Sequence, residues 1–472
     1  MRICHISTND IDGGAARAAY RLHTGLLRLG HDSTMLVKHK LSNDPHVTVF
    51  QSGWSRWRRL LGLLRAKRIA ADLSRYPSAS LKHGGFFTDD RSRFGEALAH
   101  AVPDCDVVNL HWVGFDFMDY RGFFRVMAER RIPVVWTMHD MNPFTGGCHY
   151  TGGCERFRDK CGGCPVLGGQ ATDLGFAKGY AGHGCRPQTT DQGRTKNYER
   201  RTTNQEHNAE GVNEEFNADL SRRIWERKRR ALDRARAQGL GLRIVSPSRW
   251  LADCAGKSTL LKGIPVSVIP YGLDPDRFRP LDGGGLRQAL GVSPEYRMIL
   301  FVAASLKDCR KGLFLLRTAL REPSLADINL HLVGVGNGGS VDGFDGLRVS
   351  FTGEIAGDDL LSLVYSAADL FVIPSREDNL PNTVIEAMAC GTPVVGFDCG
   401  GIPDMVRSGK TGLLAPVGDV ESLANAIRTF LEDDALRHRM SVECRETVLR
   451  EFTLERQASA YAALYESLIE GS

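Results

Sequence analysis

Short apolar runs alternate with amphipathic stretches along most of the chain. Residues 2–7 form the first such run, residues 9–14 are polar and rich in glycine, and leucines recur at helical spacing within 15–29. A second β-rich run covers 33–38. Because a strand, a loop, a helix and a further strand follow in this order, the segment predicts a unit of a parallel sheet.

The alternation continues into the C-terminal part of the chain. Residues 370–373 are apolar without interruption, which is typical of a strand covered on both faces of its sheet. We therefore predict an α/β protein with two doubly wound, Rossmann-like domains facing each other across a cleft. The other β-rich runs are 107–110, 133–138, 243–246, 266–269, 298–303, 328–333, 347–351 and 393–397.

The expected domains are an N-terminal domain over 1–240 and a C-terminal domain over 241–444. A last helix, within 445–472, is expected to return to the N-terminal domain. The join between the two domains contains several prolines, with Pro247 and Pro270 near its ends. Proline interrupts regular structure, so this region suits a linker.

Two insertions interrupt the N-terminal domain. A Cys-rich insert covers 141–169, and a flexible insertion covers about 172–216. Between 177 and 215, Val212 is the only Val, Leu, Ile, Phe or Met. Such a segment cannot bury enough apolar surface to offset the entropy lost on ordering, so we predict that it is flexible.

Composition and charge exclude several classes of protein. The formal charge of +4 is too small to imply nucleic-acid binding. The chain has no apolar run long enough to span a membrane, and its start lacks the apolar core of a signal peptide. We therefore expect a cytoplasmic protein whose cysteines stay reduced.

Residues 54–70 combine two tryptophans and several leucines with arginine and lysine. A basic amphipathic helix of this kind suits an anionic membrane surface. The alternative is a helix packed on the protein body with its basic face in water.

Four cysteines are crowded into a short segment: Cys148, Cys154, Cys161 and Cys164. Four thiolates at this spacing, one pair of them Cys-x-x-Cys, are candidates for a structural tetrahedral zinc site. Unpaired thiols and disulfides are the alternatives.

The stretch 374–401 carries the densest chemistry. It follows the strand 370–373, and a helix is expected to start near Asn382 and end at Gly391. The N-terminus of a helix at the carboxyl end of a parallel strand favours a diphosphate. Asp378 and Glu386 lie beside this position, and their carboxylates are suited to accept hydrogen bonds from sugar hydroxyls.

This stretch resembles glycosyltransferase family 4, whose members are retaining enzymes of GT-B fold that use nucleotide sugars. The resembling pattern is Pro-Ser, an acid, seven residues, then Glu-Ala-Met-Ala-x-Gly-x-Pro-Val-Val and Gly-Gly. Asp378 stands at the position of the family's first Glu, and Pro381 lies in a loop that is usually Gly-Phe-Gly. Within the family, the Cys-rich insert resembles that of a subset close to colanic-acid-type exopolysaccharide transferases.

The resemblance implies the roles of the site residues. Catalytic roles fall on His139, Lys311 and Asp378. Lys311 would hold the diphosphate, and Arg310 or Lys307 would replace the family's arginine, because Leu306 stands at its position. Donor-binding roles fall on Gly14, Arg310, Ile355, Asn379, Leu380, Asn382, Thr383 and Glu386.

The implied reaction is transfer of a sugar from a UDP- or GDP-sugar to a polyprenyl-linked glycan, at the inner face of the cytoplasmic membrane, in exopolysaccharide or other cell-surface polysaccharide synthesis. The acceptor hydroxyl would attack from the side of the leaving diphosphate, so no cofactor is required for catalysis. Asp10 and Asp12 are candidates to face the acceptor.

Two other functions stay open: a GT-B nucleotide-sugar epimerase, and an inactive, zinc-stabilised interaction protein. A phosphorylase would need a pyridoxal-phosphate lysine context that the sequence lacks. The Gly-x-Gly-x-x-Gly run at 334–339 is not followed by a helical stretch, so it does not predict a dinucleotide site.

Overall fold

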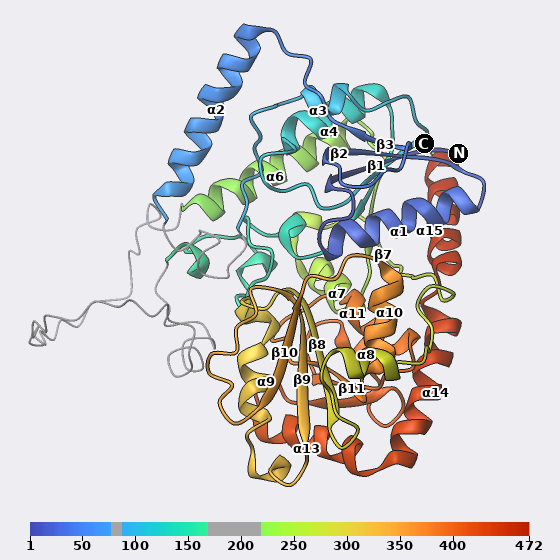
Figure 1. Ribbon diagram of the computed structural model, residues 1–472. Coiled ribbons are helices and arrows are strands. Elements are labelled where there is room, and N and C mark those ends of the chain that lie inside the picture. The colour runs from blue at the N-terminus through green and yellow to red at the C-terminus, as the bar shows by residue number, and fades with distance from the viewer. Residues whose placement is uncertain (77–86, 169–218, 472) are drawn as a thin grey trace, which may run out of the picture.

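The computed structural model describes residues 1–76, 87–168 and 219–471 (Figure 1). The predicted flexible insertion at 172–216 lies outside the described residues. The protein has two α/β domains, one stacked on the other, which are called the first and the second layer below. The chain passes between them twice (Figure 1). Each layer is built around one parallel sheet with helices on both faces.

The first sheet has seven strands in the order β3-β2-β1-β4-β5-β6-β7, and its strand pairs are parallel. Its strands are β1 (Arg2–Asn9), β2 (Asp32–His39), β3 (Val47–Val49), β4 (Val107–Leu110), β5 (Val134–Thr137), β6 (Leu242–Ser246) and β7 (Val266–Val268). Its helices are α1 (Gly14–Arg28), α2 (Arg56–Ser74), α3 (Ala97–His100), α4 (Tyr120–Arg130), α6 (Leu220–Ala237) and α7 (Arg249–Lys257).

The second sheet has six strands in the order β10-β9-β8-β11-β12-β13, again in parallel pairs. Its strands are β8 (Arg297–Ser305), β9 (Leu330–Asn337), β10 (Arg348–Gly353), β11 (Leu370–Ile373), β12 (Val394–Phe397) and β13 (Gly412–Ala415). Its helices are α8 (Gly284–Ala289), α9 (Leu313–Ala319), α10 (Asp358–Ala367), α11 (Asn382–Ala389), α12 (Ile402–Met405), α13 (Val420–Glu432) and α14 (Asp434–Glu451).

The predicted fold class is confirmed, since both sheets have doubly wound order. Central strands are apolar because helices cover both faces: every residue of β11 is buried. Helices are amphipathic because one face packs on a sheet. In α13, for example, Leu423, Ile427 and Phe430 are buried at helical spacing.

The boundary predicted at residue 240 is wrong. Strands β6 and β7 lie beyond it but pair with β5 in the first sheet. The chain leaves this sheet only after Ile269, which packs in the core beneath α1. The sequence did not show this, because a β-rich run has the same appearance whichever sheet it joins.

The return of the chain follows the expected course but starts later than residue 445. Helix α14 packs against α11 of the second layer, and the final helix, α15 (Leu454–Glu470), packs against α1. Tyr461 and Tyr465 of α15 are buried in the first layer. Tyr465 accepts a hydrogen bond from Asn109 Nδ2 of β4 at 2.7 Å.

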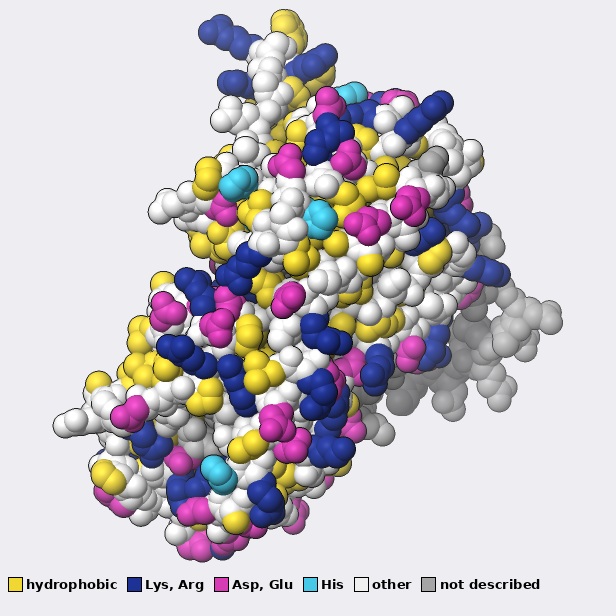
Figure 2. All heavy atoms as spheres, turned by 90° about the vertical axis from the view of Figure 1, so that its right-hand side faces the viewer, with side chains coloured by type: hydrophobic (Ala, Val, Ile, Leu, Met, Phe, Trp, Pro, Cys, Tyr) yellow, Lys and Arg dark blue, Asp and Glu magenta, His cyan; other side chains and the backbone are white. Residues whose placement is uncertain are grey.

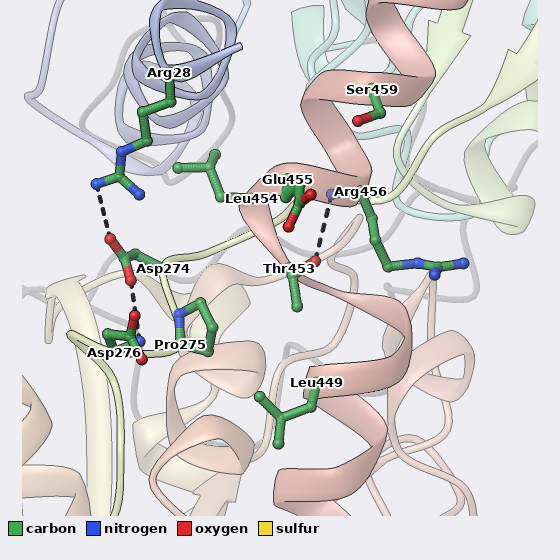
Figure 3. Close-up of a pocket in the computed structure, with 10 residues that line it drawn as sticks. All are labelled: Arg28, Asp274, Pro275, Asp276, Leu449, Thr453, Leu454, Glu455, Arg456 and Ser459. Atoms are coloured by element: carbon green, nitrogen blue, oxygen red, sulfur yellow. Dashed lines mark hydrogen bonds and ion pairs between the residues drawn. The ribbon is translucent and has the colours of Figure 1, made fainter.

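The two crossings of the chain touch. Leu273 donates its N–H to Phe452 O at 3.0 Å and accepts one from Leu454 N at 2.9 Å. Beside this bridge lies an open pocket of about 730 Å³, and on its wall Arg28 of α1 is paired with Asp274 at 2.8 Å (Figure 3). The two layers are therefore joined by a short hydrogen-bonded bridge at their edge.

Candidate active site

The predicted site residues of the second layer meet where the strand order reverses. Between β8 and β11 the chain leaves the sheet in opposite directions, and in an open parallel sheet the ligand crevice is expected at the carboxyl ends of two such strands. Strand β8 leads to a short 3-10 helix, Cys309–Lys311, and β11 leads to the loop before α11. Gly312 (φ +75°) permits the approach, because a Cβ there would lie 1.9 Å from Pro374 O.

Lys311 and Asp378 form an ion pair in this crevice. Lys311 Nζ lies 2.5 Å from Asp378 Oδ2, and Arg310 Nη1 lies 3.4 Å from Asp378 Oδ1. Burial alone would raise the pKa of Asp378, but the charges of Lys311 and Arg310 outweigh it and hold that pKa below its ordinary value. The crevice therefore contains two cations around one buried carboxylate.

Arg310 is the more enclosed of the two cations. Its guanidinium lies over the ring of Tyr150 at 4.4 Å and donates to Glu377 O at 2.9 Å. Its Nε is a buried donor with no hydrogen-bond partner in the described part of the protein. Tyr150 belongs to the Cys-rich insert, as does Gly152, whose N–H donates to Glu377 Oε2 at 3.0 Å.

The start of α11 faces the first sheet. Asn379 accepts a hydrogen bond from Ser248 Oγ at 2.6 Å and donates one to His139 O at 3.1 Å. Asn382 Nδ2 donates to Gly14 O at 2.9 Å. Asn382 Oδ1 is buried and has no hydrogen-bond partner among the described residues. The predicted residues Gly14, His139, Asn379 and Asn382 thus come together although they are far apart in sequence.

Glu386 is held by a residue that the sequence reading missed. Arg21 of α1 donates to Glu386 Oε1 at 2.7 Å, and Tyr365 Oη donates to Glu386 Oε2 at 3.0 Å. Both side chains of the ion pair are largely buried. Arg21 lies about two helical turns after the glycine loop. This position on the same helix face was the one feature of the sequence that could have predicted its contact with the site.

His139 uses both of its ring nitrogens within the protein. Nδ1 lies 2.6 Å from Tyr271 Oη, and Nε2 lies 3.0 Å from His111 Nδ1. His111 in turn lies 2.9 Å from His5 Nδ1. Burial lowers the pKa of His139 to about 4 and the pKa values of His111 and His5 well below the ordinary value. These imidazoles are therefore neutral at pH 7. The contact of His139 with the loop before α11 is made by its backbone carbonyl, which accepts from Asn379.

The remaining donor-binding candidates lie around the same crevice. Leu380 is buried in the core of the second layer, Thr383 is half-buried in the first turn of α11, and Ile355 packs half-buried against that core. Asp10 has a different role from the one expected. Its carboxylate accepts the backbone N–H groups of Ile11, Leu41 and Ser42, so it holds two loops together.

The four predicted zinc ligands line one small cavity of about 20 Å³: Cys148, Cys154, Cys161 and Cys164. Cys148 Sγ and Cys164 Sγ are 3.7 Å apart and not bonded, and Cys161 Sγ accepts the N–H of Gly146 at 3.1 Å. Within the described ranges, no three His, Cys, Asp or Glu side chains are arranged to hold a metal ion. The zinc site stays a prediction.

Solved structures share the fold of this chain. Sucrose-phosphate synthase from Thermosynechococcus elongatus superposes with a TM-score of 0.62 at 20% identity, covering 100% of both chains. HepE from Anabaena, solved in complex with UDP, superposes with a TM-score of 0.58 at 16% identity, covering 99% of this chain and 100% of that one.

The fold is GT-B. In this GT-B chain, residues 296–433 match the family model described as "Glycosyl transferases group 1". The D-inositol 3-phosphate glycosyltransferase of Geodermatophilus obscurus is 33% identical over 218 residues, which is 43% of this chain and 47% of that protein. The chain thus spans about half the length of that relative. The matched segment contains Arg310, Lys311, Asp378 and Glu386, the charged residues of the crevice.

Proposed function

We propose that this protein is a retaining glycosyltransferase that moves a sugar from a nucleotide-sugar donor to a glycan acceptor. The observation that carries the proposal is the pair of cations, Arg310 and Lys311, beside the N-terminus of α11. A diphosphate needs fixed positive charge and free N–H donors, and this crevice supplies both.

Two buried polar atoms support a ligand in this position. Arg310 Nε and Asn382 Oδ1 have no hydrogen-bond partner in the part of the chain that the structure describes. Buried polar groups are nearly always satisfied, so an unsatisfied donor on Arg310 and an unsatisfied acceptor in the first turn of α11 support a ligand that binds these residues.

The chemistry follows from charge. As the bond between sugar and diphosphate breaks, negative charge grows on the diphosphate, and cations fixed around it lower the barrier. Lys311 would exchange part of its contact with Asp378 for the diphosphate, leaving Asp378 to accept hydrogen bonds from sugar hydroxyls. The acceptor hydroxyl would attack the anomeric carbon from the side on which the diphosphate leaves and give its proton to that diphosphate. Because the new bond forms on the face where the old one breaks, the anomeric configuration is retained without a protein nucleophile.

The donor is proposed to be a UDP- or GDP-sugar. Support for UDP comes from HepE, whose structure holds UDP in the same fold. Glu386 is the residue proposed to bind the ribose, and Ile355 lies at the position proposed for the base.

The acceptor is proposed to be a polyprenyl-linked glycan in exopolysaccharide or other cell-surface polysaccharide synthesis, at the inner face of the cytoplasmic membrane. The support is the Cys-rich insert, which resembles that of exopolysaccharide transferases. Its Tyr150 packs on Arg310, so the insert lies close enough to shape the acceptor side of the crevice.

A donor screen tests the proposal. The purified protein is incubated with UDP- and GDP-sugars, with and without polyprenyl-linked acceptors, and released nucleotide is measured. We expect one donor to be consumed and its sugar to appear on the acceptor. Sugar products without transfer would instead support an epimerase, and calorimetry detecting no binding of any nucleotide sugar would support an inactive interaction protein.

A further inference from the structure

Helix α2 stands away from the body of the protein (Figure 1). It has two buried residues: Gly62, against which the ring of Trp54 packs, and Ile69. Arg65 adds an ion pair to Asp119 at the start of α4. One face of α2 therefore anchors the helix, and the rest of it points away from the protein.

The outward face carries an apolar stripe. Trp57, Leu60, Leu61 and Leu64 are spaced i, i+3, i+4 and i+7, so they lie on one side of the helix. Trp57 is 76% exposed and Leu61 63%. The stripe lies nearly opposite Gly62 and Ile69, because these residues are displaced from it by about half a turn of helix. Within residues 1–76, 87–168 and 219–471, the stripe is therefore not buried against the protein body.

Basic side chains surround the stripe. Helix α2 contains six of them, Arg56, Arg58, Arg59, Arg65, Lys67 and Arg68, against one acid, Asp72. Asp72 lies at the far end of the helix and is paired with Arg91. Dark blue and yellow side chains accordingly protrude together at the top of Figure 2, at the height where α2 begins in Figure 1.

We propose that α2 docks on an anionic lipid surface, with the stripe in the acyl boundary and the arginines among the headgroups. Arginine beside exposed tryptophan and leucine matches an anionic bilayer in both charge and polarity, and tryptophan favours this interface. Nucleic acid would match the charge but not the stripe. No helix among the described residues could cross a membrane, so α2 would lie on the surface.

This inference deepens the proposed function, because it names the surface that would bring the enzyme to a lipid-linked acceptor. It is tested without turnover, so the two can fail separately. The full-length protein is sedimented with vesicles of phosphatidylcholine alone, or with about one third phosphatidylglycerol. We expect binding only to the anionic vesicles, a loss of binding in high salt, and a blue shift of tryptophan emission on binding.

Two variants locate the contact. Trp57→Gln with Leu61→Gln removes the centre of the stripe, and Arg56→Gln with Arg59→Gln removes charge. Each is expected to lower vesicle binding about tenfold or more, since every basic residue near an anionic surface contributes to binding. The matched control is Val442→Gln with Arg439→Gln on α14, where both residues are exposed, and it should bind as the parent does.

Three results would overturn the proposal. The first is no binding to anionic vesicles while calorimetry still detects nucleotide-sugar binding. The second is vesicle binding that the α2 variants leave unchanged. The third is a dimer in solution that the stripe variant converts to monomers, because a second copy of the chain would then be what covers the stripe.

Discussion

Arg21 of α1 and Glu386 of α11 join the two layers of the molecule through a buried ion pair of 2.7 Å. The phenol of Tyr365 completes the contact, and the ring of Phe278 lies 5.3 Å from the Arg21 guanidinium. The acid proposed to bind the donor ribose is thus paired with a residue of the opposite domain. Donor binding at Glu386 would have to displace or share this arginine.

Arg21→Ala is expected to destabilise the protein by about 3–5 kcal/mol, because it leaves the buried Glu386 charge without its partner. Denaturant unfolding measures this free energy. Arg28→Ala on the same helix is the matched control: Arg28 is 60% exposed in its pair with Asp274, so the expected loss is about 1 kcal/mol or less. A double variant Arg21→Ala, Glu386→Gln should lose less than the two single variants combined. Additive losses would show that the pair is not coupled.

Lys311→Ala is expected to lower turnover about 10²–10³-fold, because the cation that stabilises the leaving diphosphate is gone. Initial rates with the donor found in the screen measure the loss, and circular dichroism checks that the fold is kept. Lys262→Ala, at an exposed position outside the crevice, is the control and should retain most activity. Unchanged turnover in Lys311→Ala would contradict the proposed diphosphate contact.

The histidine chain predicts acid sensitivity. The pKa of His139 is lowered to about 4 in the folded protein, against about 6.5 in the unfolded chain. The unfolded state therefore binds more protons between these values, and stability is fully present above about pH 6.5 and is lost as the pH falls toward 4, by about 3 kcal/mol for His139 alone. Urea unfolding at several pH values measures the slope.

A variant tests whether the three hydrogen-bonded histidines cause this dependence of stability on pH. His5→Gln removes one imidazole that must be protonated and is expected to flatten the pH dependence, although it lowers stability at pH 7. His438→Gln, at an exposed position, should leave the slope as it is. If the slope of His5→Gln equals that of the parent, protonation of His5 does not contribute to the acid sensitivity.

The Cys-rich insert is expected to bind one equivalent of zinc. Tetrahedral zinc holds each sulfur at about 2.3 Å, which places two ligand sulfurs about 3.8 Å apart. Cys148 Sγ and Cys164 Sγ already lie 3.7 Å apart, and Cys154 and Cys161 line the same cavity. Elemental analysis of the reduced protein measures the metal. Cys164→Ser should lose it and Cys105→Ser, in another part of the layer, should keep it. A parent protein without zinc would show that the insert is held by its packing alone.

The sequence was sufficient to predict the two sheets and the crevice of the second one. Periodicity identifies strands and helices because each element must bury one face or both, and this requirement acts on neighbouring residues. Residues 370–373 and the glycines at 400–401 are examples. A Cβ on Gly400 would lie 1.7 Å from Asp378 O, so the glycine in the motif records a close backbone contact. Such local constraints put Lys311, Asp378 and Asn382 at the right strand ends.

Only the tertiary structure decided what faces this crevice. Arg21 lies far along the chain from α11 and carries no motif, so nothing local marks it, and the insert that contains Tyr150 gave no sign that this ring would pack on Arg310. The assignment of β6 and β7 to the first sheet likewise depends on contacts between distant segments. The same holds for the outward direction of the α2 stripe. The sequence pattern indicates which residues are buried and which are charged. The packing of distant segments determines which residue each of them contacts.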